Sequence, residues 1–311
     1  MKKQIEAISI IVTILITFLL GYFSIEFFKS YGWSVFVFAP VLIGFLPSFI
    51  VGKADGISKK KSSKLGFVTL AFSCLGLLLF AFEGIICIIM SLPIFMLLTW
   101  IGSYLGYFLS VKQKISSSNI TIILLFFSFS FMGFDYVKKE PTLIPVTTTI
   151  VVNSSVEKVW KNVVTFNKIP EPKELIFKTG ISYPTDATIK GKGVGAIRYC
   201  NFTTGSFVEP ITTWDEPNLL QFNVVKQPIP MNEWNPFWDI HPPHLDGYFR
   251  SYKGQFKLIE MTDNKTKLEG TTFYKVAIQP EFYWEVWSDF IIHRIHERVL
   301  NHIKLESEKK I

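Results

Sequence analysis

The first 137 residues contain no arginine and only five acidic residues, although ten lysines lie among their apolar runs. Residues 138–311 hold 22 Lys and Arg side chains against 20 acidic ones, so this second half is nearly neutral. A nucleic-acid-binding protein carries its basic residues as a patch on a folded surface. Lysines in short loops between apolar segments indicate membrane orientation instead. We therefore expect no nucleic-acid partner.

Cysteine is scarce, with Cys74 and Cys87 in the apolar half and Cys200 alone in the second half. The second half therefore has no disulfide of its own, and no Cys-x-x-Cys pair is present to hold zinc. The glycine-rich run GKGVG, residues 191–195, precedes a strand pattern and not a helix, which excludes a phosphate-binding loop. A G-x-S-x-G hydrolase motif and Asp-x-Asp calcium spacing are also missing. We expect no cofactor.

Long apolar runs fill the first half, and each is long enough to cross a bilayer as a helix. Lysines precede the first run, separate the second from the third and follow the fourth, which places the N-terminus in the cytoplasm. Five crossings then place the second half outside, although Lys138 and Lys139 favour the opposite side. We predict an integral protein of a bacterial plasma membrane, with a transmembrane region at 1–137 and a soluble domain at 138–311. The predicted spans are about 5–28, 33–51, 65–82, 84–110 and 119–136.

The second half begins with a β-branched run after Pro145, followed by NSSVEKVWKNV, residues 153–163. The Asn-Ser-Ser sequence is typical of a helix start, and the apolar residues after it have helical spacing. Runs typical of strands follow between Gly, Pro and Asn residues, and Glu281 to Lys309 is predicted to form one long helix. The predicted strands are about 193–203, 206–214, 218–227, 248–261 and 266–278.

This order of elements resembles the START/Bet v 1-like superfamily, also called SRPBCC or polyketide cyclase/dehydrase and lipid transport. The resemblance covers about 145–308 and is carried by NSSVEKVWKNV, GKGVGAIRY, WDEPNLLQFNV and KTKLEGTTFY. It implies an α+β helix-grip fold, a curved antiparallel sheet around a long C-terminal helix, here preceded by an all-α transmembrane bundle of about five helices. Members bind sterols, lipids, polyketides and hormones, and a minority are cyclases or dehydratases, so the fold alone assigns no activity.

The resemblance also exposes an insertion rich in proline and tryptophan, residues 226–249, between two predicted strands. Its prolines exclude regular ladder pairing, and Trp234 and Trp238 favour burial or an interface. We expect a rigid loop that serves as a lid near the cavity mouth, as a contact with the bilayer surface, or as a hydrophobic plug without ligand contact.

Several polar residues are candidates for the walls of the implied cavity. Arg198 and Cys200 share one face of a predicted strand, and Glu209 ends the next apolar run. On the C-terminal helix, Asp289, His293 and His296 interrupt an apolar stripe that also includes Phe282, Val286, Ile292, Leu300 and Ile303. The full set of candidate ligand-binding residues is Arg198, Cys200, Glu209, Trp234, Trp238, His241, His244, Asp289, His293 and His296.

The stretch DIHPPHLDGYF, residues 239–249, places His241 and His244 around a stiff Pro-Pro pair. These two histidines, together with His293, His296 and Asp289, are the candidates for a metal site, although the superfamily is not known for metal and the prolines splay the imidazoles. A clasp between the loop and the C-terminal helix is the other interpretation.

The expected function is binding of a hydrophobic or amphipathic, lipid-like small molecule by a membrane-anchored helix-grip domain, with the bilayer as a second partner. The alternative is a cyclase, dehydratase or hydrolase that uses cavity histidines and carboxylates. A signalling or scaffold protein without ligand is the third interpretation. Binding ranks first because it requires only an apolar cavity with a few polar anchors.

Overall fold

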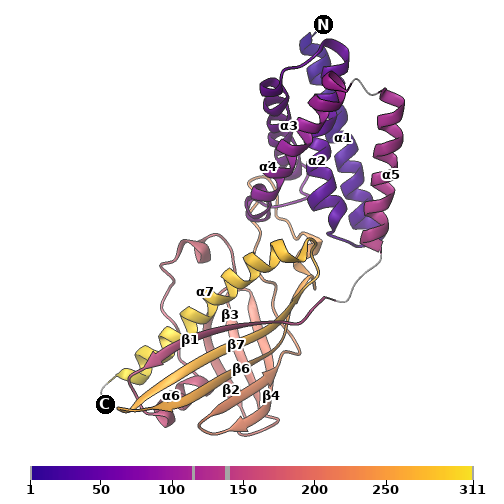
Figure 1. Ribbon diagram of the computed structural model, residues 1–311. Helices are drawn as coiled ribbons and strands as arrows, with labels where there is room; N and C mark the ends of the chain where they lie inside the picture. Colours follow the sequence, from indigo (N-terminus) through magenta and orange to yellow (C-terminus); the bar gives the residue numbers. More distant parts are fainter. Residues whose placement is uncertain (1, 114–115, 137–140, 310–311) are drawn as a thin grey trace. The chain divides into compact units, whose positions relative to one another are not determined.

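The computed structural model describes residues 2–113, 116–136 and 141–309, and these form two compact units (Figure 1). The helical unit comprises Met1–Glu140, Glu233–Pro242 and Ile278–Phe282, and the sheet unit comprises Pro141–Asn232, Pro243–Ala277 and Tyr283–Ile311. The predicted boundary between residues 137 and 138 falls outside the described residues. Two segments from the second half of the chain, Glu233–Pro242 and Ile278–Phe282, thus belong to the same unit as the apolar helices.

Long helices make up most of the helical unit: α1 (Lys2–Phe28), η1 (Ser34–Phe38) continuing into α2 (Ala39–Asp55), α3 (Lys59–Leu79), α4 (Ile85–Tyr107) continuing into η2 (Phe108–Lys112), and α5 (Ser117–Tyr136). Five helical stretches in the described part of the chain are long and apolar enough to cross a membrane. Their ends agree with the predicted spans to within a few residues, except that α3 begins about six residues earlier because its basic first turn is also helical.

Glycines allow close approach of α2, α3 and α4. A Cβ atom on Gly44 of α2 would overlap the backbone oxygen of Thr99 in α4, and one on Gly102 of α4 would overlap the backbone oxygen of Val41. The Ser62 hydroxyl of α3 donates to the backbone oxygen of Ser103 at 2.7 Å. Small residues and hydroxyl hydrogen bonds are the usual means of helix association where no water drives it.

Replacing Gly44 by alanine is expected to lower the melting temperature of the full chain in detergent, because backbone on α4 must move by the width of a methyl group at a cost of about 1–3 kcal/mol. The matched control is Gly21→Ala in α1, where a Cβ atom meets nothing within 4 Å. That control removes a helix glycine without a clash and should raise stability by up to about 1 kcal/mol. Equal shifts in the two variants would contradict the close-packing argument.

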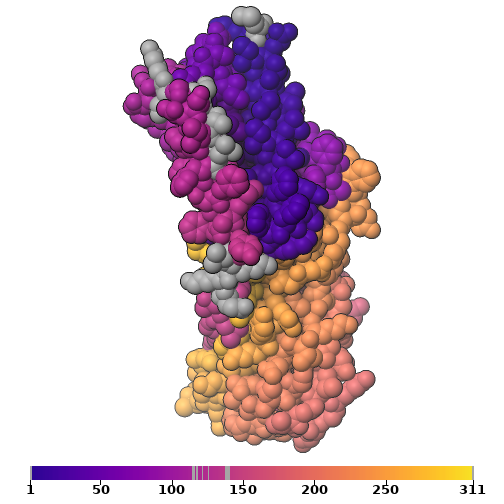
Figure 2. All heavy atoms as spheres, turned by 90° about the vertical axis from the view of Figure 1, so that its right-hand side faces the viewer, coloured from indigo at the N-terminus to yellow at the C-terminus, as the bar shows by residue number. Residues whose placement is uncertain are grey.

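The outer faces of α1 and α5 remain apolar and exposed within the described residues. Figure 2 shows α1 in indigo and α5 in magenta side by side at the surface. Exposed apolar patches larger than a few hundred square ångströms are rare on soluble monomers. Their exposed large apolar side chains include Ile8, Leu15, Leu19, Phe23 and Phe27 in α1, and Ile122, Phe126, Phe129 and Phe134 in α5.

The proline- and tryptophan-rich insertion contributes Glu233–Pro242 to the helical unit. The Asn235 side-chain amide donates to the backbone oxygen of Leu78 at 3.0 Å, and the Trp238 indole donates to that of Leu79 at 2.9 Å. The Cys87 backbone N–H donates to the Glu233 carboxylate at 3.0 Å, close to the N-terminus of α4. Such bonds satisfy the end groups that a helix leaves unpaired. The insertion thus binds the ends of α3 and α4.

The sheet unit contains seven antiparallel strands in the order β1-β7-β6-β5-β4-β3-β2. The long helix α7 (Glu281–Glu308) runs along the curved sheet (Figure 1), and the short helix α6 (Val156–Val164) follows β1. This is the predicted helix-grip fold. The strands are β1 (Ile144–Val152), β2 (Pro184–Lys190), β3 (Ile197–Phe202), β4 (Gly205–Asp215), β5 (Leu219–Asn223), β6 (Phe249–Met261) and β7 (Lys265–Val276), with short 3-10 helices η3 (Leu175–Lys178) and η4 (Pro243–Leu245).

The predicted apolar stripe on α7 is wrong near the start of the helix. Phe282 and Val286 are exposed, whereas Trp284 and Ser288 are buried. Further along, Ile292, Leu300 and Ile303 are buried as predicted, and Leu300 and Ile303 join one core cluster with Val152, Trp160, Leu220 and Leu268. The prediction assumes that the same face of the helix is buried along its whole length. In the first turns, however, the buried residues are Trp284, Ser288 and Ile292, which are four residues apart and form a row beside the predicted stripe.

Candidate ligand-binding cavity

A cavity of about 140 Å³ lies in the sheet unit between α7 and the strands. Strands supply its polar residues by alternation, since every second side chain of β3 and β4 faces inward. Apolar side chains form most of its wall. The lining residues are Ser182, Arg198, Cys200, Phe202, Phe207, Glu209, Phe222, Val224, Gln227, Pro228, Ile229, Pro230, Phe249, Ser251, Lys253, Gly254, Gln255, Phe256, Gly270, Thr271, Thr272, Ile291, Ile292, Ile295, His296, Val299 and Leu300.

A buried ion pair lies on this wall. Arg198 of β3 and Glu209 of β4 are direct cross-strand partners, and the guanidinium Nη1 bonds the Glu209 carboxylate. Both side chains are almost fully buried, at 2% and 6% exposure. Burial raises the pKa of Glu209, an effect that Arg198 partly opposes. Because a buried guanidinium without a counter-ion costs several kcal/mol, the contact with Arg198 favours the ionised form of Glu209.

The Arg198 guanidinium is held in place on several sides. Its Nε donates to the backbone oxygen of Val164 at 3.3 Å, and its Cζ lies 5.5–5.7 Å from the ring centroids of Phe166, Phe222 and Phe256. Its Nη2 is buried and has no hydrogen-bond partner among the described residues. An unpaired buried donor costs about 1–3 kcal/mol. A ligand oxygen that accepts from Nη2 would recover that free energy.

Cys200 lies two residues from Arg198 on β3 and is also buried. Burial raises the pKa of its thiol to about 12, with a further contribution from the Glu209 charge. The thiolate is the reactive form of cysteine. The raised pKa favours the neutral, less reactive thiol at physiological pH.

His296 and His293 of α7 meet a threonine of β1. Thr148 Oγ1 lies 2.7 Å from His293 Nδ1 and 3.1 Å from His296 Nδ1, and Thr272 Oγ1 of β7 lies 2.7 Å from His296 Nε2. A hydroxyl donates one hydrogen bond and accepts others, so Thr148 can donate to one ring and accept from the other. Both ring nitrogens of His296 are therefore occupied by protein hydroxyls.

Burial lowers the pKa of His296 to about 4, and the neighbouring His293 adds to this effect. The unfolded chain binds that proton near pH 6.5, so the free energy of unfolding should fall by roughly 2–3 kcal/mol as the pH decreases from about 7 to about 4.5. Burial also lowers the pKa of His302, which acts in the same direction. We expect the melting temperature of His296→Gln to fall less than that of the wild type when the pH decreases from about 7 to about 4.5. Tryptophan fluorescence of the full chain in detergent measures both melting temperatures.

The matched control for this pH dependence is His241→Gln, because His241 is exposed. Its melting temperature should follow the wild type at both pH values. A pH dependence of His296→Gln as steep as that of the wild type would contradict the assignment.

The other predicted site residues are not among the lining residues of the cavity. Asp289 accepts a hydrogen bond from the hydroxyl of the buried Tyr274 at 2.7 Å and is not among the lining residues. Trp234 and Trp238 are exposed and belong to the helical unit, as does the exposed His241. His244 is buried on η4 of the sheet unit. The predicted clasp between the loop histidines and α7 stays a prediction.

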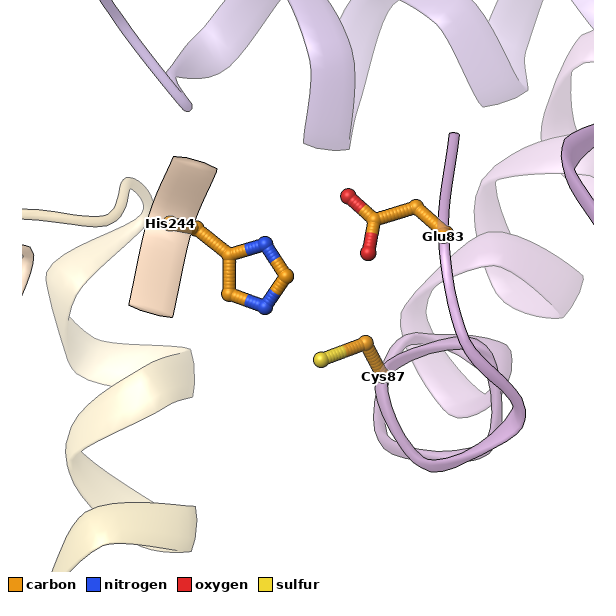
Figure 3. A group of neighbouring side chains, drawn as sticks. All are labelled: Glu83, Cys87 and His244. Carbon is orange, nitrogen blue, oxygen red and sulfur yellow. The ribbon is translucent and has the colours of Figure 1, made fainter. Parts of the chain in front are cut away.

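The candidate metal set stays a prediction. His241 and His244 fall in different units, and His293 and His296 are joined through Thr148. Within the described ranges, neither helix histidine belongs to a group of three metal-ligating side chains. Figure 3 shows Glu83 on the turn before α4 and Cys87 on the first turn of α4, both in the helical unit, and it also draws His244 of the sheet unit.

Sequence reasoning missed Thr148, Thr272 and the aromatic rings around Arg198. Strand alternation contained part of the signal, because Thr148 shares a face of β1 with the buried Val146 and Val152. The rings were not predictable in this way, since Phe166 comes from the segment after α6, Phe222 from β5 and Phe256 from β6.

No family model matches the sequence, and no curated protein matches it significantly. Several solved structures are similar to about half of the chain. Truncated norcoclaurine synthase from Thalictrum flavum is 14% identical, with a TM-score of 0.36, and the match covers 55% of this chain and 98% of that one.

Two further structures give similar values. The Zhui aromatase/cyclase from Streptomyces sp. R1128 is 12% identical, with a TM-score of 0.34, and the match covers 54% of this chain and 94% of that one. A protein from Nitrosospira multiformis is 20% identical, with a TM-score of 0.34, and the match covers 53% of this chain and 97% of that one. Such low values carry no argument about function.

Proposed function

We propose that this chain is a membrane-anchored binding protein for a hydrophobic or amphipathic small molecule, which it holds in the cavity of the sheet unit. The observation that carries the proposal is the buried Arg198 on an otherwise mostly apolar wall, with an Nη2 that lacks a partner among the described residues. Ligand sites are typically apolar cavities with a few fixed polar groups. The five apolar helices support the membrane anchor.

Binding is favoured over catalysis by the state of the polar groups on the wall. A general base needs a free lone pair within reach of the substrate, yet both nitrogens of His296 contact threonine hydroxyls. The Glu209 carboxylate is engaged by Arg198, and burial raises the pKa of the Cys200 thiol to about 12, which favours its less reactive neutral form. The extracytoplasmic position of the sheet unit is part of the proposal and rests on the lysine distribution.

Native mass spectrometry of the full chain, purified in a mild detergent, tests the proposal. A small molecule should remain bound to the wild type. The matched variant is Gly270→Leu, since Gly270 lines the cavity and an added Cβ there makes only ordinary contacts with Leu300 and Phe256. The larger side chain narrows the cavity and should remove the bound molecule. An empty wild-type cavity combined with turnover of an ester substrate would favour the enzyme instead.

A further inference from the structure

We propose that the cavity selects an uncharged molecule of about one ring, with a carbonyl, amide or hydroxyl oxygen that accepts from Nη2 of Arg198, and that it discriminates against carboxylates. This inference rests on the proposed function and narrows its ligand class. It follows from the charge balance around Arg198, from the other polar groups on the wall and from the size of the cavity.

The positive charge of Arg198 is already balanced inside the protein. Glu209 bonds Nη1 of the same guanidinium, and both side chains are buried. A ligand carboxylate at Nη2 would be attracted by Arg198 but repelled by Glu209 across the same group. It would also lose its hydration on entering an apolar cavity. A neutral oxygen satisfies Nη2 without either cost.

Besides Arg198, only His296 and Lys253 on the described wall could supply a positive charge to a buried carboxylate. His296 is neutral at physiological pH, and threonine hydroxyls occupy both of its ring nitrogens. Lys253 also lines the cavity, but its side chain is exposed and its Nζ lies 4.3 Å from the centroid of the Phe273 ring. Its charge is therefore screened by solvent.

The cavity volume limits the buried part of the ligand. At about 140 Å³ the cavity is close in size to an engineered cavity of about 150 Å³ in another protein, which binds benzene. One ring or a short chain fills this space. A longer lipid would have to extend beyond it.

The test uses the full chain in phosphatidylcholine nanodiscs and three probes of similar size: toluene, benzamide and benzoate. Dissociation constants are measured by calorimetry near neutral pH, and signals from empty nanodiscs are subtracted to remove partitioning into lipid. We expect benzamide to bind at least about tenfold more tightly than benzoate, a difference of about 1.4 kcal/mol. Acetophenone should behave like benzamide. In the wild type, benzamide should also bind more tightly than toluene, because its oxygen accepts from Nη2. In the variant Arg198→Met/Glu209→Leu, which removes both charges, this difference in affinity between benzamide and toluene should disappear.

Each result has one interpretation. Benzoate binding as tight as that of benzamide in the wild type, with toluene also bound, overturns the selectivity while the proposed binding function stands. Absence of binding for all probes overturns the binding function, and the selectivity with it. Because the comparison of benzamide, acetophenone and benzoate is made on the wild type, it does not depend on the folding of the double variant.

Discussion

Replacing Arg198 by methionine is expected to destabilise the sheet unit by about 3–5 kcal/mol, because it leaves the buried Glu209 carboxylate without its counter-ion. For a unit of this size, such a loss lowers the melting temperature by roughly 6–20 °C. Tryptophan fluorescence of the full chain in detergent reports it, since Trp160 and Trp214 pack edge to face in the sheet unit.

The control is the double variant Arg198→Met/Glu209→Leu. Exchanging a whole buried ion pair for apolar residues is often neutral or stabilising, so most of the lost melting temperature should return. The deficit of the single variant should also be smaller at acidic than at neutral pH, since burial then raises the pKa of Glu209 unopposed and protonation removes the charge. Equal losses in the single and double variants would show that Arg198 acts through packing alone.

Local sequence signals were sufficient for most of the fold. The β-branched run of β1, the helical spacing in α6 and the long C-terminal pattern all correspond to observed elements. Strand β2 was not predicted, because PTDATIK contains a proline and polar residues and pairs only with β3 in the named strand ladders. It lies at the edge of the sheet, so its formation depends on pairing with β3, the next strand in the chain, and not on its own strand propensity.

Predicting the candidate site was harder because its contacts join distant segments. Strand alternation placed Arg198 and Cys200 on one face, and the structure places that face on the cavity wall beside Glu209. Alternation does not say which face is buried. The contacts of His296 with Thr148 and Thr272 require the packing of α7 on β1 and β7, which no local pattern encodes.

That packing of α7 on the sheet leads to the last prediction. Ile303 is fully buried in the core cluster of the sheet unit, together with Val152, Trp160 and Leu268. Truncation of a buried isoleucine to alanine removes its burial energy and leaves a void, at a cost of about 2–5 kcal/mol. We therefore expect Ile303→Ala to lower the melting temperature of the sheet unit by roughly 4–20 °C, measured by the fluorescence of the full chain in detergent.

Leu305 offers a matched control two positions further along the same helix. Its side chain is 64% exposed, so Leu305→Ala removes a similar number of methyl groups without opening a cavity and should change stability by no more than about 0.5 kcal/mol. Both substitutions place alanine in a helix, so the difference between them isolates the burial of Ile303 against the sheet. If Leu305→Ala were as destabilising as Ile303→Ala, α7 would not turn the face of Ile303 toward the core, and the wall that α7 gives the cavity would have to be reassigned.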